Sequence, residues 1–172
     1  MNPDYRKQSR NLYENADLEY QRCYFDEITG GFILIHHNHN LSDSESFVAE
    51  VLAKMGKRVK LLSEIAAEGV KTPDAEIDGQ ICDFKELTEE SQNIRNRVQE
   101  GISKAKNQGA TCVIFHINRD NYDAWRINAG IRQALFWDAT NLIQEIIFVF
   151  NNQIIQSITG EEWRNGKQFQ RI

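Results

Sequence analysis

The sequence predicts an α/β fold in which a mixed central β-sheet is flanked by helices. Short apolar runs rich in β-branched and aromatic residues indicate strands, and longer segments with apolar residues three or four apart indicate helices. The run 111–117 is almost entirely apolar, which is typical of a strand buried on both faces. The chain has 172 residues, of which 41% are hydrophobic, and only two prolines, so we expect one domain over 1–172.

The first half of the chain is expected to contribute three strands and a helix. Residues 18–25 and 32–37 are apolar runs separated by a turn, and 58–62 is a third such run. Residues 45–55 have helical spacing and follow a Leu-Ser-Asp-Ser stretch that supplies N-capping residues. Gly56 comes next, so we expect it to end this helix in the left-handed conformation.

The second half is expected to alternate strands and helices after a β-hairpin. Asp78 and Gly79 suit the positive φ angles of a two-residue turn, which places them at the hairpin tip. The expected elements are the hairpin 75–85, the helix 91–108 closed by Gly109, the strand 111–117, the helix 122–138, and a C-terminal hairpin of 145–150 and 153–158. Their order predicts an αβββαβ core over about 42–117, with an N-terminal extension before it.

Charge and composition exclude several classes of protein. The formal charge is −5, and residues 1–45 account for most of it with eight acidic and four basic residues, so 1–30 is interpreted as an acidic lead-in. No run approaches the ~20 apolar residues of a membrane span, and the first residues lack the apolar segment of a secretion signal. Three cysteines without a C-x-x-C pair argue against a disulfide or zinc framework and for a reducing, cytoplasmic location.

The central hairpin is predicted to gather two carboxylates and an amine on one face. Side chains alternate along a strand, so Asp83 and Lys85 face the same way, while Phe84 points oppositely into a core. With the Asp-Gly turn at the tip, Asp74 falls directly opposite Asp83. Opposed carboxylates destabilise a hairpin unless something offsets their repulsion.

A divalent cation would offset that repulsion. Two carboxylates with water and a phosphate oxygen suit Mg²⁺, and Lys85 could orient an attacking water or stabilise developing charge. Glu45 is a candidate third acid, because Val48 and Leu52 follow it at helical spacing on the inward face. The alternatives are an exposed hairpin with scattered charges and a Glu45 that is stabilised only by the helix dipole.

These residues resemble the PD-(D/E)xK nuclease superfamily, which has the restriction-endonuclease-like fold. The matching positions are Pro73, Asp74, Asp83 and Lys85 of the signature, and Glu45, Val48, Leu52 and Gly56 of the family's E-x-x-A-x-x-x-L-x-x-x-G helix run. The stretch 42–117 is most similar to the tRNA-cleaving C-terminal domains of contact-dependent growth inhibition toxins. One departure is Asp at position 83, where the family more often has Glu.

The resemblance implies metal-dependent hydrolysis of phosphodiester bonds in nucleic acid, with RNA or tRNA favoured over DNA. The implied ligands of Mg²⁺ or Mn²⁺ are Asp74, Asp83 and Glu45. Lys85 would act on the attacking water, and Gln108 would support the site. The resemblance also implies a cognate immunity protein as a partner, no membrane partner, and delivery to a target cytoplasm as part of a larger protein.

Substrate contacts are expected on the helix 91–108 and at the rim of the site. Arg97 and Lys104 share a helical stripe that could follow a phosphate backbone, and His116 ends the neighbouring strand. The aromatic residues of the helix 122–138 are expected mainly in the core; they are Trp125, Phe136 and Trp137.

Two other functions stay open at the level of sequence. One is a catalytically inactive binding or assembly module that keeps the fold. The other is a metal-independent ribonuclease that uses His36, His37 or His116 for acid–base chemistry. His36, His37 and His39 cluster at the end of a predicted strand, where His36 and His37 should point to opposite faces.

Overall fold

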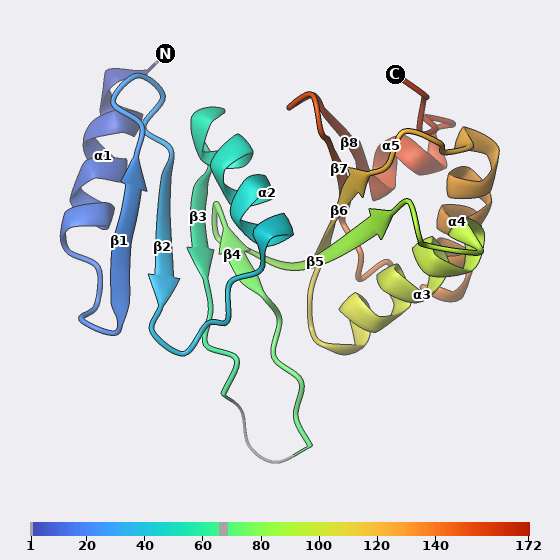
Figure 1. Cartoon of the computed structure of the whole chain (residues 1–172), viewed down its shortest axis with the longest axis horizontal. Coiled ribbons are helices and arrows are strands. Elements are labelled where there is room, and N and C mark those ends of the chain that lie inside the picture. The colour runs from blue at the N-terminus through green and yellow to red at the C-terminus, as the bar shows by residue number, and fades with distance from the viewer. Residues whose placement is uncertain (1, 66–68) are drawn as a thin grey trace. The chain divides into compact units, whose positions relative to one another are not determined.

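The computed structural model describes residues 2–65 and 69–172, and it divides the chain into two compact units (Figure 1). We call Met1–Ile81 the N-terminal unit and Cys82–Ile172 the C-terminal unit. Each unit contains parallel and antiparallel strand pairs with helices packed on them. The predicted α/β class with mixed β-sheet and flanking helices is therefore confirmed.

The N-terminal unit has its strands in the order β1-β2-β3-β4. β1 is antiparallel to β2, β2 is parallel to β3, and β3 is antiparallel to β4. Its elements are α1 (Pro3–Glu14), β1 (Tyr20–Phe25), β2 (Phe32–His36), α2 (Asp43–Lys54), β3 (Arg58–Leu61) and β4 (Ala75–Ile77). Val48 and Leu52 of α2 are buried, as are Val59 and Leu61 of β3, so this helix face and the sheet share one core.

α1 was not expected, because residues 1–30 were interpreted as a lead-in with one strand. The start signals are nevertheless present: the Asn2 side chain caps the helix by accepting from the Asp4 amide, and Pro3 occupies the first turn. α1 packs against β1 and β2. Its buried Ser9 accepts a hydrogen bond of 2.7 Å from Arg58 Nε, which joins the helix to β3.

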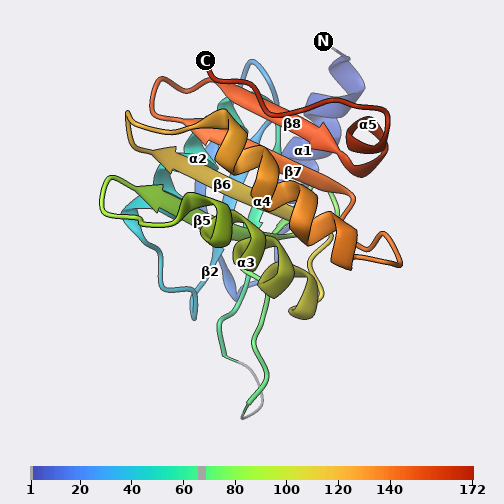
Figure 2. The same ribbon diagram turned by 90° about the vertical axis from the view of Figure 1, so that its right-hand side faces the viewer.

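The C-terminal unit is built around β6. This strand is parallel to both β5 and β7, β7 is antiparallel to β8, and the segment 112–117 of β6 is buried throughout. Figure 2 shows α3 and α4 side by side on one face of these strands. The elements are β5 (Gln80–Thr88, which begins before the unit boundary), α3 (Ile94–Asn107), β6 (Cys112–Asn118), α4 (Ala124–Trp137), β7 (Glu145–Phe150), β8 (Ile155–Thr159) and α5 (Gly160–Arg164).

Glycines allow close packing within the C-terminal unit. A Cβ atom at Gly130 of α4 would lie 2.5 Å from the Arg95 carbonyl oxygen of α3, so the two helices can approach closely only without that atom. A Cβ at Gly101 of α3 would lie 3.1 Å from the Phe115 ring and 3.3 Å from Lys85 Cγ. α3 therefore passes directly over the stem of Lys85.

The order α2-β3-β4-β5-α3-β6 matches the predicted αβββαβ sequence of elements. The predicted turn is also confirmed, because Asp78 and Gly79 have φ angles of 51° and 81°. Gly56 and Gly109 follow their helices with φ angles of 91° and 86°, as expected of left-handed caps. The C-terminal hairpin has a longer turn than expected, since β8 begins at Ile155, and α5 was not expected.

The aromatic residues of α4 are a second correction. Trp125, Phe136 and Trp137 were expected mainly in the core, but their exposed fractions are 67%, 79% and 56%. The inward stripe of α4 consists of Ile127 and Ile131, which are fully buried, and positions 125 and 136 lie away from it.

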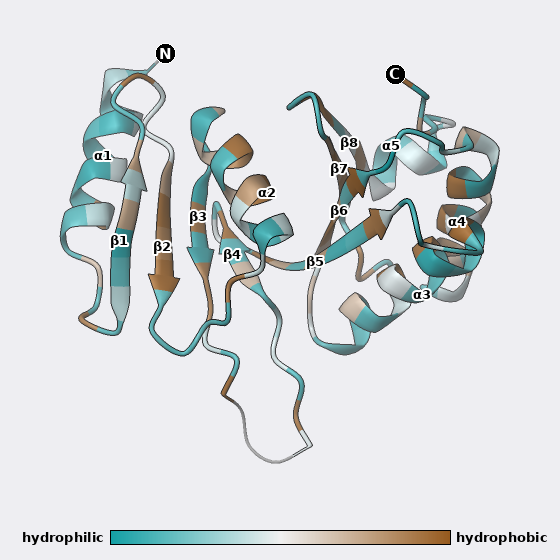
Figure 3. Ribbon diagram, in the orientation of Figure 1, coloured by the Kyte–Doolittle hydropathy of each residue, from teal (hydrophilic) through white to brown (hydrophobic). Residues whose placement is uncertain are grey.

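The hydropathy of the chain follows the burial pattern. Figure 3 shows hydrophobic residues concentrated along β2. Both faces of this strand are covered, since four of its five residues are buried and the fifth is half-buried. Among the described residues, no helix is both long and apolar enough to cross a membrane.

Candidate functional site

Three of the predicted site residues meet in the C-terminal unit. Lys85 Nζ lies 2.5 Å from Asp83 Oδ2. With the Gln108 amide oriented so that its nitrogen faces Asp83, that nitrogen donates to both carboxylate oxygens, at 3.0 and 3.1 Å. Asp83 is 2% exposed, so its charge is held away from solvent by an ammonium group and an amide.

The strand and helix that carry these residues explain the arrangement. Asp83 and Lys85 are two apart on β5, so they share a face, as the alternation of strand side chains predicts. Gln108 is the C-cap residue of α3, the helix that passes over Lys85 through Gly101. Phe84, expected in a core, is half-buried.

Asp83, Lys85 and Gln108 together offer a metal-binding oxygen, a positive charge and an orienting amide. Asp83 offers a hard carboxylate oxygen of the kind that binds Mg²⁺ or Mn²⁺. Lys85 is a quarter exposed, at 26%, so its ammonium group can also face a ligand such as a phosphate oxygen. Gln108 orients the carboxylate by donating to both oxygens.

Glu45 lies in the N-terminal unit, on the inward face of α2, with its side chain 14% exposed. It forms a capping box with Ser42: Glu45 Oε2 accepts from the Ser42 amide at 2.9 Å, and Ser42 Oγ accepts from the Glu45 amide at 3.1 Å. Burial disfavours the Glu45 charge, but the contact with His39 and the hydrogen bonds from Ser42 outweigh it and lower the pKa of Glu45.

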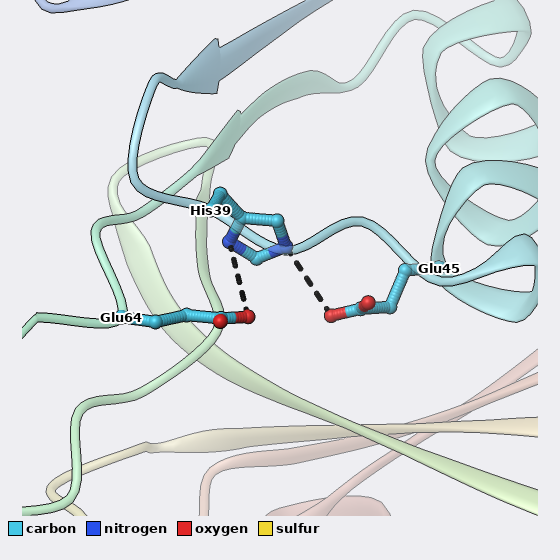
Figure 4. A group of neighbouring side chains, drawn as sticks. All are labelled: His39, Glu45 and Glu64. Carbon is cyan, nitrogen blue, oxygen red and sulfur yellow. Dashed lines mark ion pairs between the residues drawn. The ribbon is translucent and has the colours of Figure 1, made fainter.

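Glu45 belongs to a cluster that sequence reasoning did not identify (Figure 4). His39 Nε2 lies 3.4 Å from Glu45 Oε1, and His39 Nδ1 lies 3.9 Å from Glu64 Oε1. One potential ligand atom from each residue falls within 4.8 Å of the others. Burial alone would lower the pKa of His39, but Glu45 and the Leu62 carbonyl raise it overall. The sequence indicates that His36, His37 and His39 form a histidine-rich patch of the kind that can bind metal, but no spacing connects His39 to Glu64.

Asp74 also lies in the N-terminal unit, directly before β4, where its carbonyl oxygen accepts from the Leu62 amide at 2.9 Å. Asp74 and Glu45 thus belong to one unit, and Asp83, Lys85 and Gln108 belong to the other. The convergence of all these side chains on one metal ion stays a prediction.

The expected substrate contacts differ in accessibility. Arg97 and Lys104 are exposed on α3, and Lys104 lies 3.9 Å from Glu100. His116 is 4% exposed, and its Nε2 pairs with Asn151 Oδ1 at 2.8 Å, so its ring is covered in this conformation.

His36 and His37 do not point to opposite faces. Their rings stack with centroids 4.4 Å apart, because β2 ends at His36 and His37 already belongs to the following turn. His36 is buried, its Nδ1 accepts from the Asn38 amide at 3.0 Å, and its Nε2 lies 3.5 Å from Glu19. Strand alternation was the wrong rule to apply beyond the strand end.

One family model matches part of the chain. Residues 71–155 match the contact-dependent growth inhibition CdiA C-terminal domain. The matched range is a little under half of the chain and contains Asp74, Asp83, Lys85 and Gln108, whereas His39, Glu45 and Glu64 precede it.

One solved structure is similar to the chain, a CdiA-CT/CdiI toxin and immunity complex from Burkholderia pseudomallei. The identity is 20%, the match covers 67% of this chain and 81% of that chain, and the TM-score is 0.48. Among curated proteins no similar sequence was found.

Proposed function

We propose that this chain is a toxin domain of the CdiA C-terminal type that hydrolyses phosphodiester bonds in RNA, with tRNA as the favoured substrate, and depends on a divalent metal ion. The observation that carries the proposal is the buried Asp83 carboxylate, held by Lys85 and Gln108 within the range that matches this family. A buried ion pair contributes little to stability by itself, so a role in chemistry accounts better for the Asp83–Lys85 pair than a structural role does.

The donor set fits Mg²⁺ or Mn²⁺. Asp74, Asp83 and Glu45 are all carboxylates, and hard oxygen ligands are what these cations bind. When bound, such an ion lowers the pKa of a coordinated water and neutralises phosphate charge.

The residues of the chain supply positioning and charge. Gln108 holds the Asp83 carboxylate in one orientation by donating to both oxygens. Lys85 is fixed by Asp83 and by the close passage of α3, so its ammonium group can stabilise negative charge that develops on a phosphate oxygen without reorganising.

The surface of α3 and α4 suits a polyanion. These two helices carry six basic residues and one acidic residue, in a chain that has 20 basic and 25 acidic residues overall. Trp125 and Phe136 are exposed on α4, where aromatic rings can stack on unpaired bases. We therefore extend the substrate surface from Arg97 and Lys104 on α3 to α4.

A toxin of this kind acts in the cytoplasm of a target cell, and the cell that makes it needs a neutralising partner. The proposal therefore includes delivery as part of a larger protein and a cognate immunity protein. Cys23, Cys82 and Cys112 form no disulfide in the described part of the chain, which suits a reducing compartment.

The test is cleavage of total tRNA and of plasmid DNA by the purified chain, with Mg²⁺, with Mn²⁺ and with EDTA. Asp83→Asn and Lys85→Met should each lower the rate at least about 100-fold, the scale of losing a charge-stabilising group. Glu50→Gln and Lys54→Met are matched controls, because these residues form an exposed pair on α2, 2.7 Å apart. Cleavage that survives both site substitutions and EDTA would contradict the proposal.

The same assay separates the second candidate, a metal-independent ribonuclease. Cleavage that resists EDTA and is lost in His36→Gln, His37→Gln or His116→Gln would favour it, because imidazole can accept and donate a proton near neutral pH. Absence of cleavage on every nucleic acid would favour a binding or assembly module.

A further inference from the structure

His39 is the buried side chain whose hydrogen bonding is incomplete among the described residues. Its side chain is 0% exposed, and its Nε2 atom has no hydrogen-bond partner. The other ring nitrogen, Nδ1, lies 2.7 Å from the Leu62 carbonyl oxygen. An unpartnered buried ring nitrogen is costly, so the surroundings of Nε2 need an explanation.

The Leu62 carbonyl decides which nitrogen carries hydrogen. A carbonyl oxygen only accepts, so Nδ1 must be protonated, and a neutral His39 therefore has its lone pair on Nε2. That lone pair faces Glu45 Oε1 at 3.4 Å, which is also an acceptor. Two acceptors that face each other require a positive charge between them, either a proton or a metal ion.

The two carboxylates of the cluster each direct an oxygen atom toward the His39 ring. The capping box occupies Glu45 Oε2 and leaves Oε1 directed at His39. The Glu64 carboxylate points toward that of Glu45 on the same side of the ring (Figure 4), and it is 41% exposed, so it can move and gives access from solvent. A histidine that ligates a metal through one nitrogen commonly donates its other N–H to a backbone carbonyl, as His39 does to Leu62.

The distances fit a small tetrahedral ion. Ligand atoms placed about 2.1 Å from a tetrahedral Zn²⁺ lie roughly 3.4 Å from one another. The separation of His39 Nε2 and Glu45 Oε1 is already 3.4 Å. One ligand atom of each residue lies within 4.8 Å of the other two, so the exposed Glu64 has at most about 1.4 Å to move to reach the tetrahedral spacing.

We propose that His39, Glu45 and Glu64 form a binding site for a transition-metal ion, with Zn²⁺ as the expected occupant and water completing its coordination. One imidazole and two carboxylates favour Zn²⁺ over Mg²⁺, which binds oxygen ligands. The site lies wholly in the N-terminal unit and does not rest on the proposed nuclease function. Glu45 is shared with the ligand set expected for the nuclease, so the test measures metal binding and not cleavage.

The experiment titrates the metal-free full-length chain with Zn²⁺ by calorimetry and with Co²⁺ by visible absorption. Wild type should bind one equivalent of Zn²⁺ and give the d–d bands of tetrahedral Co²⁺, with millimolar Mg²⁺ competing poorly. Glu64→Gln should weaken Zn²⁺ binding at least about 10-fold, and His39→Gln should abolish it. Glu64 is partly exposed, so its substitution should preserve the fold even if His39→Gln does not.

Matched controls locate the site. His37→Gln removes a neighbouring exposed histidine, and Glu50→Gln removes an exposed carboxylate from the same helix as Glu45. Both should bind Zn²⁺ as wild type does.

Three results would overturn the proposal. The first is that the wild-type chain binds no Zn²⁺. The second is that the Glu64→Gln variant has the affinity and the Co²⁺ spectrum of the wild type. The third is that Asp83→Asn or His37→Gln abolishes Zn²⁺ binding while His39→Gln keeps it. A failed nuclease assay would leave all of these measurements intact, so the two proposals fail separately.

Discussion

The two units of the chain each bury a carboxylate on an inward face and hold it with a basic side chain, but they do so differently. In the C-terminal unit, Asp83 is paired with Lys85 at 2.5 Å, and Gln108 donates to both of its oxygens. In the N-terminal unit, Glu45 faces His39 at 3.4 Å, and the nearer ring nitrogen lacks a hydrogen-bond partner.

This difference shows that the two carboxylates are satisfied to different degrees when no ligand is bound. Asp83 has its donors in place, so this pair is set for stabilising charge on a substrate. Glu45 and His39 leave a position between two acceptors that a cation can take. A lysine ammonium group has only hydrogen-bond donors, whereas a neutral imidazole has a lone pair that can ligate a metal ion.

The largest expected effect comes from breaking the Asp83–Lys85 pair. Lys85→Met should lower the free energy of unfolding by about 3 kcal/mol, because it leaves a buried carboxylate without its ammonium partner. The double variant Asp83→Asn/Lys85→Met should lose less than the sum of the single variants, by at least about 1 kcal/mol. Urea unfolding measures both values. Strict additivity would show that the pair is not coupled.

Lys54→Met is the control for that experiment. Its ammonium group pairs with Glu50 at 2.7 Å on an exposed face of α2. Exposed pairs at this spacing contribute about 0.5 kcal/mol or less.

Glu45→Gln should have a smaller effect, about 1.5 kcal/mol. The glutamine oxygen can still accept from the Ser42 amide, and His39 can become neutral, so no buried charge is left alone. Urea unfolding of the metal-free protein is the measurement. If Glu45→Gln lowered the free energy of unfolding as much as Lys85→Met does, the Glu45–His39 pair and the Asp83–Lys85 pair would not differ as described.

Acid should weaken the N-terminal unit through Asp26. Its carboxylate accepts from the Thr29 and Ile28 amides at 2.7 and 2.9 Å and from the Tyr24 hydroxyl at 3.0 Å. The backbone hydrogen bond from Thr29 is the chief cause that holds the pKa of Asp26 below its usual value.

Because the pKa is lower in the folded state, this stabilisation is complete above the unfolded pKa of about 3.9 and is lost as the pH falls through the folded value. At pH 7, Asp26→Asn should lower the free energy of unfolding by up to about 1 kcal/mol. The difference from wild type should shrink below pH ~4. Urea unfolding between pH 3 and 7 tests this, and a constant difference would refute it.

The smallest effect is expected at Arg97, which serves the substrate and not the fold. Arg97→Ala should leave the urea midpoint unchanged and weaken RNA binding modestly, with the slope of log affinity against log salt reduced by about 1. Fluorescence anisotropy at several salt concentrations gives the slope. An unchanged slope would place the phosphate contacts away from α3.

Sequence reasoning succeeded where one periodicity governs a short segment. Strand alternation was enough to put Asp83 and Lys85 on one face, and helical spacing was enough to put Glu45 with Val48 and Leu52. Gln108 was expected beside the site only from the family resemblance.

The cluster around His39 could not be predicted in the same way. It depends on where β2 ends and on which carbonyl, that of Leu62, meets the ring. Neither is visible in a pattern of hydrophobic residues. The exposure of Trp125 and Phe136 could have been predicted, because their stripe on α4 also carries Arg132. The expectation that they are buried rested on the apolar Ile131 and Leu135 of the same helix.

Helical glycines are commonly replaced by alanine to stabilise a protein, since alanine has the higher helix propensity by about 1 kcal/mol. In this chain the rule should reverse at Gly130, and tight contacts should offset the gain in helix propensity at Gly101. At Gly130 an added methyl group would meet the backbone of α3, and at Gly101 it would press on Phe115 and on the stem of Lys85. A consensus or propensity-guided redesign that ignored these contacts would loosen the C-terminal unit while raising the helicity of its parts. Thermostabilisation should therefore begin on the outward faces of the helices.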